Sequence, residues 1–148
     1  MIRAIRRDDL PAVLAAWRSL YEDAARIDPQ LQTVERALEP MARGWLVDRP
    51  FPSAFVADVG GVVGFVTIRE VDVLPVFALP RTAVIGDVWV APAQRGLGVG
   101  RALVGAATAA AAAAGCARIE VSTLAADARA LTFWQAVGFA PNRCTLVR

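Results

Sequence analysis

The order of apolar and polar residues predicts a strand and two helices in the first third of the chain. Residues 2–6 alternate apolar and polar side chains, which is typical of a short strand. Apolar residues then recur at helical spacing, with Asp8 or Asp9 as the expected N-cap. A second helix is expected over residues 33–43. The apolar positions of the first helix are Leu10, Val13, Leu14, Trp17, Leu20 and Tyr21.

The middle of the chain has the pattern of three strands. Residues 53–59 and 62–71 are rich in Val, Phe and Ile, and Gly60-Gly61 between them predicts a hairpin turn. Residues 72–81 contain two prolines and are expected to form an unusually apolar loop. Residues 82–90 contain Val, Ile and Trp and predict the next strand.

The last third begins with a glycine-rich loop at residues 91–101. An alanine-rich helix is expected directly after it, over residues 102–114. A strand at residues 118–123 and a helix at residues 127–137 follow, and residues 144–147 predict a final strand.

Composition indicates one folded domain that spans residues 1–148, since no linker and no internal repeat is visible. Hydrophobic residues make up 56% of the chain and charged residues 20%, which excludes intrinsic disorder. The net charge of +2 is too balanced for electrostatic binding of nucleic acid. The N-terminus has no signal-peptide pattern, and the alanine-rich run is too short and weakly apolar to span a bilayer. We therefore expect a cytoplasmic protein with neither nucleic acid nor membrane as a partner.

Missing residue types narrow the chemistry. The chain has no histidine, which excludes an imidazole base and a histidine metal site. Cys116 and Cys144 lie far apart, without zinc or redox spacing, and are expected to be small buried hydrophobes. We therefore predict no metal site.

The glycine-rich loop has the pattern of a pyrophosphate site. It joins a strand to a helix, so free backbone N–H groups and the helix dipole would face an anion. A Walker loop is excluded because the chain has no lysine. A dinucleotide-binding GxGxxG pattern fails at its third glycine, although Glu120 lies at a suitable distance downstream for a ribose contact.

Two motifs resemble the signatures of the GNAT acyltransferases. Val88-Trp89-Val90-Ala91-Pro92, followed by the run from Arg95 to Arg101, is similar to the family's acetyl-CoA signature. A second group at the expected distance resembles the family's Asn-x-x-Ala-x-x-Phe-Tyr-x-x-x-Gly-Phe pattern; its members are Asp127, Ala130, Phe133, Trp134, Gly138 and Phe139. The order of the expected elements also matches, so the resemblance covers essentially the whole chain.

The resemblance implies a mixed α/β fold with a mostly antiparallel sheet of six to seven strands. About four helices would flank it, and the strands would splay apart after the fourth to admit the cofactor arm. It also implies acetyl-CoA as the acyl donor. The residues that would bind it are Val88, Trp89, Val90, Arg95, Gly96, Leu97, Gly98, Val99, Gly100, Arg101, Asp127 and Trp134.

Two positions depart from the family pattern. Trp134 stands where the family commonly has a tyrosine that protonates the departing thiolate, and an indole cannot supply that proton. A thiol with a pKa of about 8.5 is nevertheless a fair leaving group. Asp127 replaces an asparagine that often contacts the cofactor arm, and it is equally suited to capping its own helix.

The catalytic base must be a carboxylate, a water relay or Tyr21, the only tyrosine. Asp87 is the first candidate because it lies in an apolar strand, although a buried carboxylate satisfied by backbone or arginine is an equal alternative. Glu120 in the next strand is the second candidate, and Glu70 is the weakest.

The resemblance therefore implies an N-acetyltransferase that acts on a primary amine, which could be a small molecule or a protein N-terminus. A non-catalytic CoA-binding or regulatory module and a dinucleotide-dependent oxidoreductase are the alternatives. Trp17, Trp45 and Trp89 are candidates for the acceptor wall, although Trp17 falls on the apolar face of its helix. The apolar loop at residues 73–79 could be a lid or the contact of a homodimer.

Overall fold

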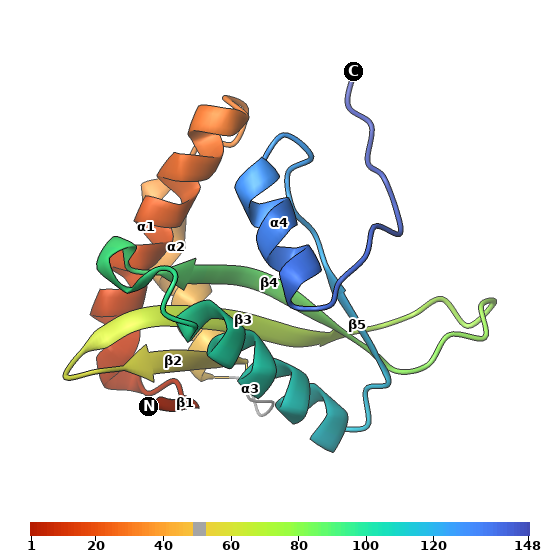
Figure 1. The fold of residues 1–148 in the computed structure, drawn as a ribbon, viewed down its shortest axis with the longest axis horizontal. Helices are drawn as coiled ribbons and strands as arrows, with labels where there is room; N and C mark the ends of the chain where they lie inside the picture. Colours follow the sequence, from red (N-terminus) through yellow and green to blue (C-terminus); the bar gives the residue numbers. More distant parts are fainter. Residues whose placement is uncertain (49–52) are drawn as a thin grey trace.

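One open sheet with helices on both faces organises the protein. The computed structural model describes residues 1–48 and 53–148. Within these ranges the sheet has five strands in the order β1-β2-β3-β4-β5 (Figure 1). The first four pair antiparallel and β5 pairs parallel with β4, which confirms the predicted mixed α/β fold. The strands are β1 (Ile2–Ala4), β2 (Ala54–Asp58), β3 (Val62–Val71), β4 (Thr82–Val90) and β5 (Arg118–Val121).

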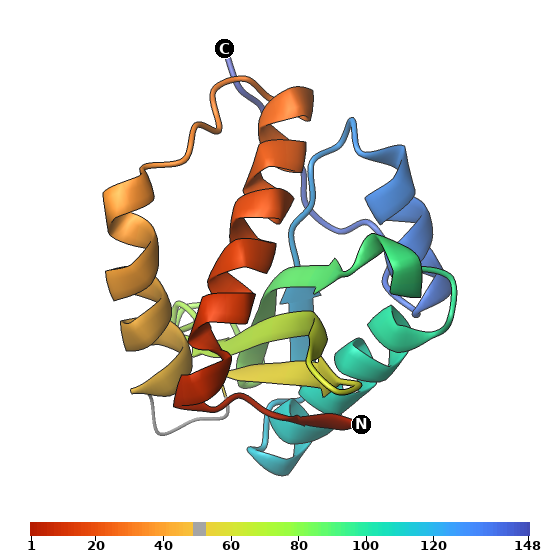
Figure 2. The ribbon, with the colours of Figure 1, turned by 90° about the vertical axis from the view of Figure 1, so that its left-hand side faces the viewer.

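The helices divide between the two faces, as Figure 2 shows. Helices α1 (Leu10–Ile27) and α2 (Glu35–Ala42) pack on one face, and α3 (Val99–Ala113) packs on the other. The fourth helix, α4 (Ala128–Ala136), packs with the α3 side of the core. No helix in the described ranges is long and apolar enough to cross a membrane.

Each helix buries the apolar stripe that its sequence predicts. On α1, Val13 and Trp17 are almost fully buried and pack with Phe65 of β3. On α3, Ala107 and Ala111 are fully buried, and their small side chains let the helix approach the sheet closely. Residues four positions apart therefore anchor both helices to the sheet.

Strands β4 and β5 separate halfway along, as the predicted splay requires. They pair only from Thr82–Arg118 to Ile85–Val121. Beyond Ile85, β4 is paired with β3 alone, so one edge of its last five residues is open. This open edge faces the cavity described below.

A bulge in β4 reverses which face its side chains occupy. Val66 pairs with Val88, whereas Ile68 pairs with Ile85, so Thr67 alone lies opposite both Gly86 and Asp87. The Thr67 hydroxyl oxygen accepts a 2.8 Å hydrogen bond from the Asp87 N–H. Ile85 packs on the α3 side and Trp89 on the α1 side, although residues four apart in a regular strand share a face. The bulge therefore turns Asp87 toward α1.

The predicted last strand, residues 144–147, is wrong, and the described part of the chain forms five strands where six to seven were expected. Residues 139–148 have no regular secondary structure. Leu146 is 90% exposed and Val147 78%, so no burial favours a strand there. Cys144 is also exposed, contrary to the prediction, whereas Cys116 is buried.

Two helix boundaries also differ from the prediction. The second helix continues as a π-helical turn, Arg43–Val47, instead of ending near residue 43. Helix α3 begins at Val99, three residues before the predicted start, because Gly98 adopts the left-handed backbone conformation at its N-cap. The glycine loop is therefore part of the first turn of the helix.

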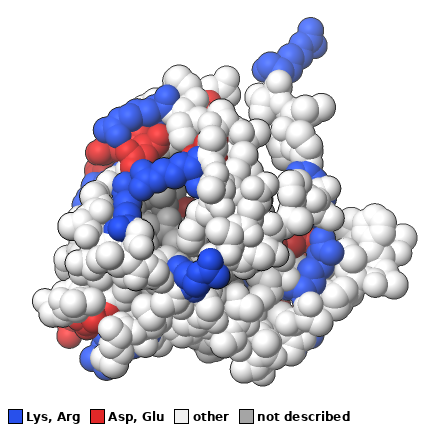
Figure 3. All heavy atoms as spheres, viewed as in Figure 1, with Lys and Arg blue, Asp and Glu red and all other residues white. Residues whose placement is uncertain are grey.

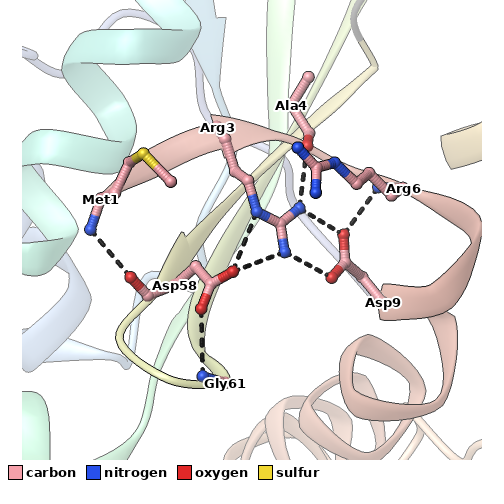
Figure 4. A network of polar contacts seen from close by, with 7 residues as sticks. All are labelled: Met1, Arg3, Ala4, Arg6, Asp9, Asp58 and Gly61. Atoms are coloured by element: carbon pink, nitrogen blue, oxygen red, sulfur yellow. Dashed lines mark hydrogen bonds and ion pairs between the residues drawn. The ribbon is translucent and has the colours of Figure 1, made fainter.

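The N-terminal segment is held by a guanidinium that bridges two carboxylates (Figure 4). Arg3 binds Asp9 through two hydrogen bonds of 2.7 and 2.8 Å and also binds Asp58. Asp9 is the N-cap residue of α1, as predicted, but its side chain accepts a hydrogen bond from the Arg6 N–H and none from the first turn of α1. Hydrogen bonds from Arg3 lower the pKa of Asp9 and of Asp58. This network connects β1, the start of α1 and the end of β2.

Candidate active site

A cavity of about 1000 Å³ lies where β4 and β5 separate. Figure 3 shows the hollow on this face, with basic and acidic side chains around it. Its wall combines the open edge of β4, the glycine loop, α4, α1 and the α1–α2 region. Predicted site residues that line it are Asp87, Val88, Trp89, Val90, Arg95, Gly96, Gly98, Gly100, Arg101, Asp127 and Trp134.

The glycine loop presents a run of free amides at one end of this cavity. Across the described ranges, no protein group accepts a hydrogen bond from the backbone N–H of residues 96–101. The next amide, Ala102 N–H, bonds to the Gly98 carbonyl as the helix begins. Six consecutive donors and the positive end of the α3 dipole therefore meet in one turn. Such an arrangement suits a phosphate or pyrophosphate.

Glycine is required at Gly98 and Gly100 for different reasons. Gly98 has φ +84°, which costs any other residue about 1–2 kcal/mol. A Cβ on Gly100 would lie 3.1 Å from the Phe133 ring, so this glycine lets α3 and α4 pack closely. Leu97 is exposed, and neither Leu97 nor Val99 lines the cavity.

The two arginines of the loop already have structural contacts. Arg95 Nε donates a 2.8 Å hydrogen bond to the Val90 carbonyl, which fixes the loop against the end of β4. Arg101 donates to the Ala136 carbonyl at the end of α4. Both line the cavity, so their positive charges lie beside the free amides.

Helix α4 supplies the opposite wall of this half of the cavity. Asp127 accepts a 2.9 Å hydrogen bond from the Ala130 N–H and so caps α4. Trp134 is 8% exposed and packs edge-on between Phe133 and Phe139. Trp134 thus belongs to the core and also contributes to the cavity wall.

Asp87 lies at the other half of the cavity, held by two side chains of α1. Trp17 Nε1 donates to Asp87 Oδ2 at 2.8 Å, and the Tyr21 hydroxyl donates to the same oxygen at 3.2 Å. Asp87 Oδ1 accepts no hydrogen bond from the described residues, and it is not sealed from solvent. The carboxylate therefore has one fixed oxygen and one that is free to meet a ligand.

Burial makes Asp87 more basic than an ordinary aspartate. Loss of solvation raises the pKa of Asp87, and hydrogen bonds from Trp17 and Tyr21 oppose that rise. No arginine or other cation binds its carboxylate within the described ranges. The uncharged donors orient the carboxylate without neutralising it, so Asp87 can accept a proton or hold a cation.

The other carboxylates predicted as bases lie elsewhere. Glu120 is absent from the cavity wall and binds Arg118 and Arg143, which lower the pKa of Glu120. Glu70 pairs with Arg81, which lowers the pKa of Glu70. The structure thus separates Glu120 from Asp87, and of the three predicted carboxylates Asp87 is the one that lines the cavity.

The aromatic residues are distributed differently from the prediction. Trp45 is 48% exposed and lines no part of the cavity, which corrects its predicted place on the acceptor wall. Trp17 is core, as its helical spacing indicated, but it also binds Asp87, which sequence reasoning missed. The available signal was the spacing of Trp17 and Tyr21, which puts two polar aromatic tips on one face of α1. Trp89 does line the cavity.

Comparison with known proteins agrees with this geometry. A family model described as the acetyltransferase (GNAT) family matches residues 14–139. The chain therefore belongs to the GNAT acetyltransferase family, as its two motifs predicted. The comparison with curated protein sequences finds no significant match.

Solved structures share the fold at low sequence identity. A tetramutant of the BH1408 protein from Bacillus halodurans has a TM-score of 0.85 at 18% identity, with 100% of this chain and 98% of that chain covered. The aminoglycoside N-acetyltransferase AAC(6')-Iy in complex with CoA has a TM-score of 0.79 at 18% identity, covering 100% and 93%. A ribosomal-protein-alanine N-acetyltransferase from Brucella melitensis biovar Abortus 2308 has 0.72 at 20% identity, covering 100% and 98%. At these identities the likeness shows the fold.

Proposed function

We propose that this protein is an acetyl-CoA-dependent N-acetyltransferase that acts by direct transfer to a primary amine. The observation that carries the proposal is the cavity that joins the free amides of residues 96–101 to the free oxygen of Asp87. One end suits a pyrophosphate and the other suits an amine. Membership of the GNAT acetyltransferase family supports the donor, and the CoA complex of a protein with this fold agrees with it.

The donor would bind along the open edge of β4. The amides of residues 96–101 would hold the pyrophosphate, with Arg95 and Arg101 beside it. The free backbone groups along Val88, Trp89 and Val90, other than the Val90 carbonyl that Arg95 binds, would pair with the amide-containing arm, like an added strand. Asp127 and Trp134 would line that arm from α4.

Asp87 would prepare the acceptor by taking a proton from its ammonium group, directly or through one water. The freed nitrogen lone pair then forms a bond to the thioester carbonyl carbon. As the carbon–sulfur bond breaks, CoA leaves as a thiolate and the amide product loses its second proton to solvent or to the thiolate. Trp134 supplies no proton, and the low pKa of a thiol, about 8.5, makes that step feasible without a protein acid.

The experiment that tests this role of Asp87 compares two carboxylate variants in a thiol-release assay with acetyl-CoA and a panel of amines. We expect Asp87→Asn to lower kcat/KM by about 100-fold or more, because a general base contributes at least that factor. Glu120→Gln should change it by less than about threefold, since Glu120 lies in ion pairs outside the cavity. Full activity in Asp87→Asn, or loss in Glu120→Gln alone, would overturn the assignment.

The second candidate is a non-catalytic CoA-binding module, which the tryptophan at position 134 favours. A fold relative from Bacillus halodurans C-125 is described as a transcriptional regulator. Such a module would bind CoA with the same loop but release no thiol with any amine. Cytoplasmic location, homodimer formation and use of a protein N-terminus as acceptor stay predictions.

A further inference from the structure

Charge is divided between the two halves of the cavity. Three arginines among the described residues line it, and they belong to the glycine loop and α4: Arg95, Arg101 and Arg129. In the half between α1, α2 and β4, the described lining residues include two acidic side chains, Asp23 and Asp87, and no basic one. Because the chain also has no lysine and no histidine, this second half is anionic. It attracts a cation and repels an anion.

Only one of the two carboxylates in this half of the cavity has no charged partner among the described residues and can therefore bind a cationic ligand. Asp23 forms an exposed ion pair with Arg26, one turn further along α1, so its charge is already compensated. Asp87 is partly buried, its carboxylate accepts hydrogen bonds from uncharged donors alone among the described residues, and its Oδ1 stays free. The site is therefore built to compensate one positive charge, not several.

The rest of the wall in this half of the cavity is mostly apolar. The Trp89 side chain presents only apolar atoms to the cavity, because its indole nitrogen is fully buried. Leu31 and Val34 are 43% and 57% exposed although they are large and apolar, and both lie on the wall. The other polar side chains on this wall are Gln32, Thr33 and Tyr21, and the Tyr21 hydroxyl donates its hydrogen bond to Asp87. The apolar lining residues are Leu20, Ala24, Leu31, Val34, Ala37, Leu38, Met41 and Trp89.

We infer that the acceptor is a monoamine with an apolar body, such as an alkylamine or arylalkylamine, whose single ammonium group binds Asp87 Oδ1. This inference rests on the proposed function. A polyamino sugar would place further ammonium and hydroxyl groups against the apolar wall, where they would lose water without gaining a hydrogen-bond partner. The site therefore selects against aminoglycosides, the compounds after which some proteins of the same fold are named.

Two amines of equal length test this inference. Hexylamine has one charge on an apolar six-carbon chain, and 1,6-hexanediamine carries a second ammonium group at the other end of the same six-carbon chain. We expect kcat/KM for hexylamine to exceed that for hexanediamine by about tenfold or more, and phenethylamine to resemble hexylamine. Equal or faster acetylation of hexanediamine or of an aminoglycoside would overturn the inference while the proposed function stands.

A binding measurement separates the failure of the inference from the failure of the proposed function. Hexylamine is titrated into the CoA-bound protein, with tryptophan fluorescence as the readout because Trp17 and Trp89 lie at the site. Saturable binding without acetylation would overturn the proposed activity and support the monoamine pocket. Absence of both binding and acetylation with all monoamines would overturn the inference.

One substitution should broaden the preference. Val34→Glu places a second carboxylate on the exposed part of the wall, at the N-cap of α2, where the helix dipole tolerates it. We expect the ratio of kcat/KM between hexylamine and hexanediamine to fall by about fivefold or more. Val59→Glu adds the same charge at an exposed position outside the cavity and should leave the ratio unchanged. An unchanged ratio in Val34→Glu, or an equal fall in Val59→Glu, would count against the inference.

Discussion

At the residue scale, the site depends on how one carboxylate is held. Asp87 faces α1 because the bulge opposite Thr67 turns it there. Trp17 and Tyr21, one helical turn apart, then fix one of its oxygens and leave the other free. Sequence reasoning found Asp87 as a charged residue in an apolar strand. It could not find the partners, because a bulge and the packing of α1 on β4 decide which side chains meet.

Tyr21→Phe tests whether Tyr21 positions the base. Its hydrogen bond lowers the pKa of Asp87, so losing it should raise that pKa further. The base works when deprotonated, so the acidic limb of the kcat/KM profile should move to higher pH. At neutral pH we expect a fall of about tenfold, in line with the loss of one hydrogen bond to a charged group.

The measurement is kcat/KM against pH for wild type and variant, with thermal unfolding as a control for folding. The phenyl ring keeps the packing on Trp17, whose ring centroid lies 5.8 Å away. A lowered plateau with an unmoved acidic limb would indicate a purely structural role for Tyr21.

At the element scale, regular patterns were predictable and irregular ones were not. Alternation and helical spacing predicted β2, β3, β4 and the four helices within a few residues. The bulge in β4 and the π-helical turn after α2 have no periodic signature, since each depends on contacts with another element. The predicted final strand failed because local propensity favours a strand only where a partner and a buried face exist.

Gly98→Glu and Gly60→Glu form a matched pair for the glycine loop. Both glycines have left-handed backbone, with φ +84° and +72°, and open space at the Cβ position. Each variant should therefore lose about 1–2 kcal/mol of stability. Only Gly98→Glu places a negative charge beside the free amides, so only it should abolish CoA binding.

Calorimetric titration with CoA, alongside urea unfolding, measures both effects. Similar CoA affinity in the two variants would mean that the loop is not the site. A much larger loss of stability in Gly98→Glu would instead mean that the loop has a structural role beyond its backbone conformation.

At the scale of the whole molecule, the two edges of the sheet have different roles in the proposed acetyl transfer. The β4 edge stays open past Ile85 and lines the cavity, whereas β1 is the edge strand on the opposite side of the sheet and is anchored by Arg3. The network of Arg3, Asp9 and Asp58 fixes the start of α1, which also carries Trp17 and Tyr21 to the site. Sequence motifs predicted the open edge through the family resemblance, but nothing in the local sequence indicated the anchor.

Arg3→Met should destabilise the protein at neutral pH and lose that effect in acid. The pKa values of Asp9 and Asp58 are lowered in the folded protein, so their contribution to stability is present above the ordinary aspartate pKa of about 3.9. It is lost as pH falls through the lowered values. The difference in unfolding free energy between wild type and Arg3→Met should therefore shrink below about pH 4.

Urea unfolding at neutral and acid pH measures this difference. Arg7→Met is the matched control, because the ion pair of Arg7 with Asp48 is exposed and contributes little. A difference for Arg3→Met that stays constant with pH, or an equal effect of Arg7→Met, would contradict the role given to the network.

The most direct test of the account follows the backbone amides of residues 96–101 by nuclear magnetic resonance while CoA is added. We predict that these amide signals shift together and saturate, because their N–H groups gain a pyrophosphate as hydrogen-bond acceptor. Amide signals of the β2–β3 hairpin at Gly60 should stay in place. If CoA at millimolar concentration leaves the signals of residues 96–101 unchanged, the acyl-donor site assigned here is wrong.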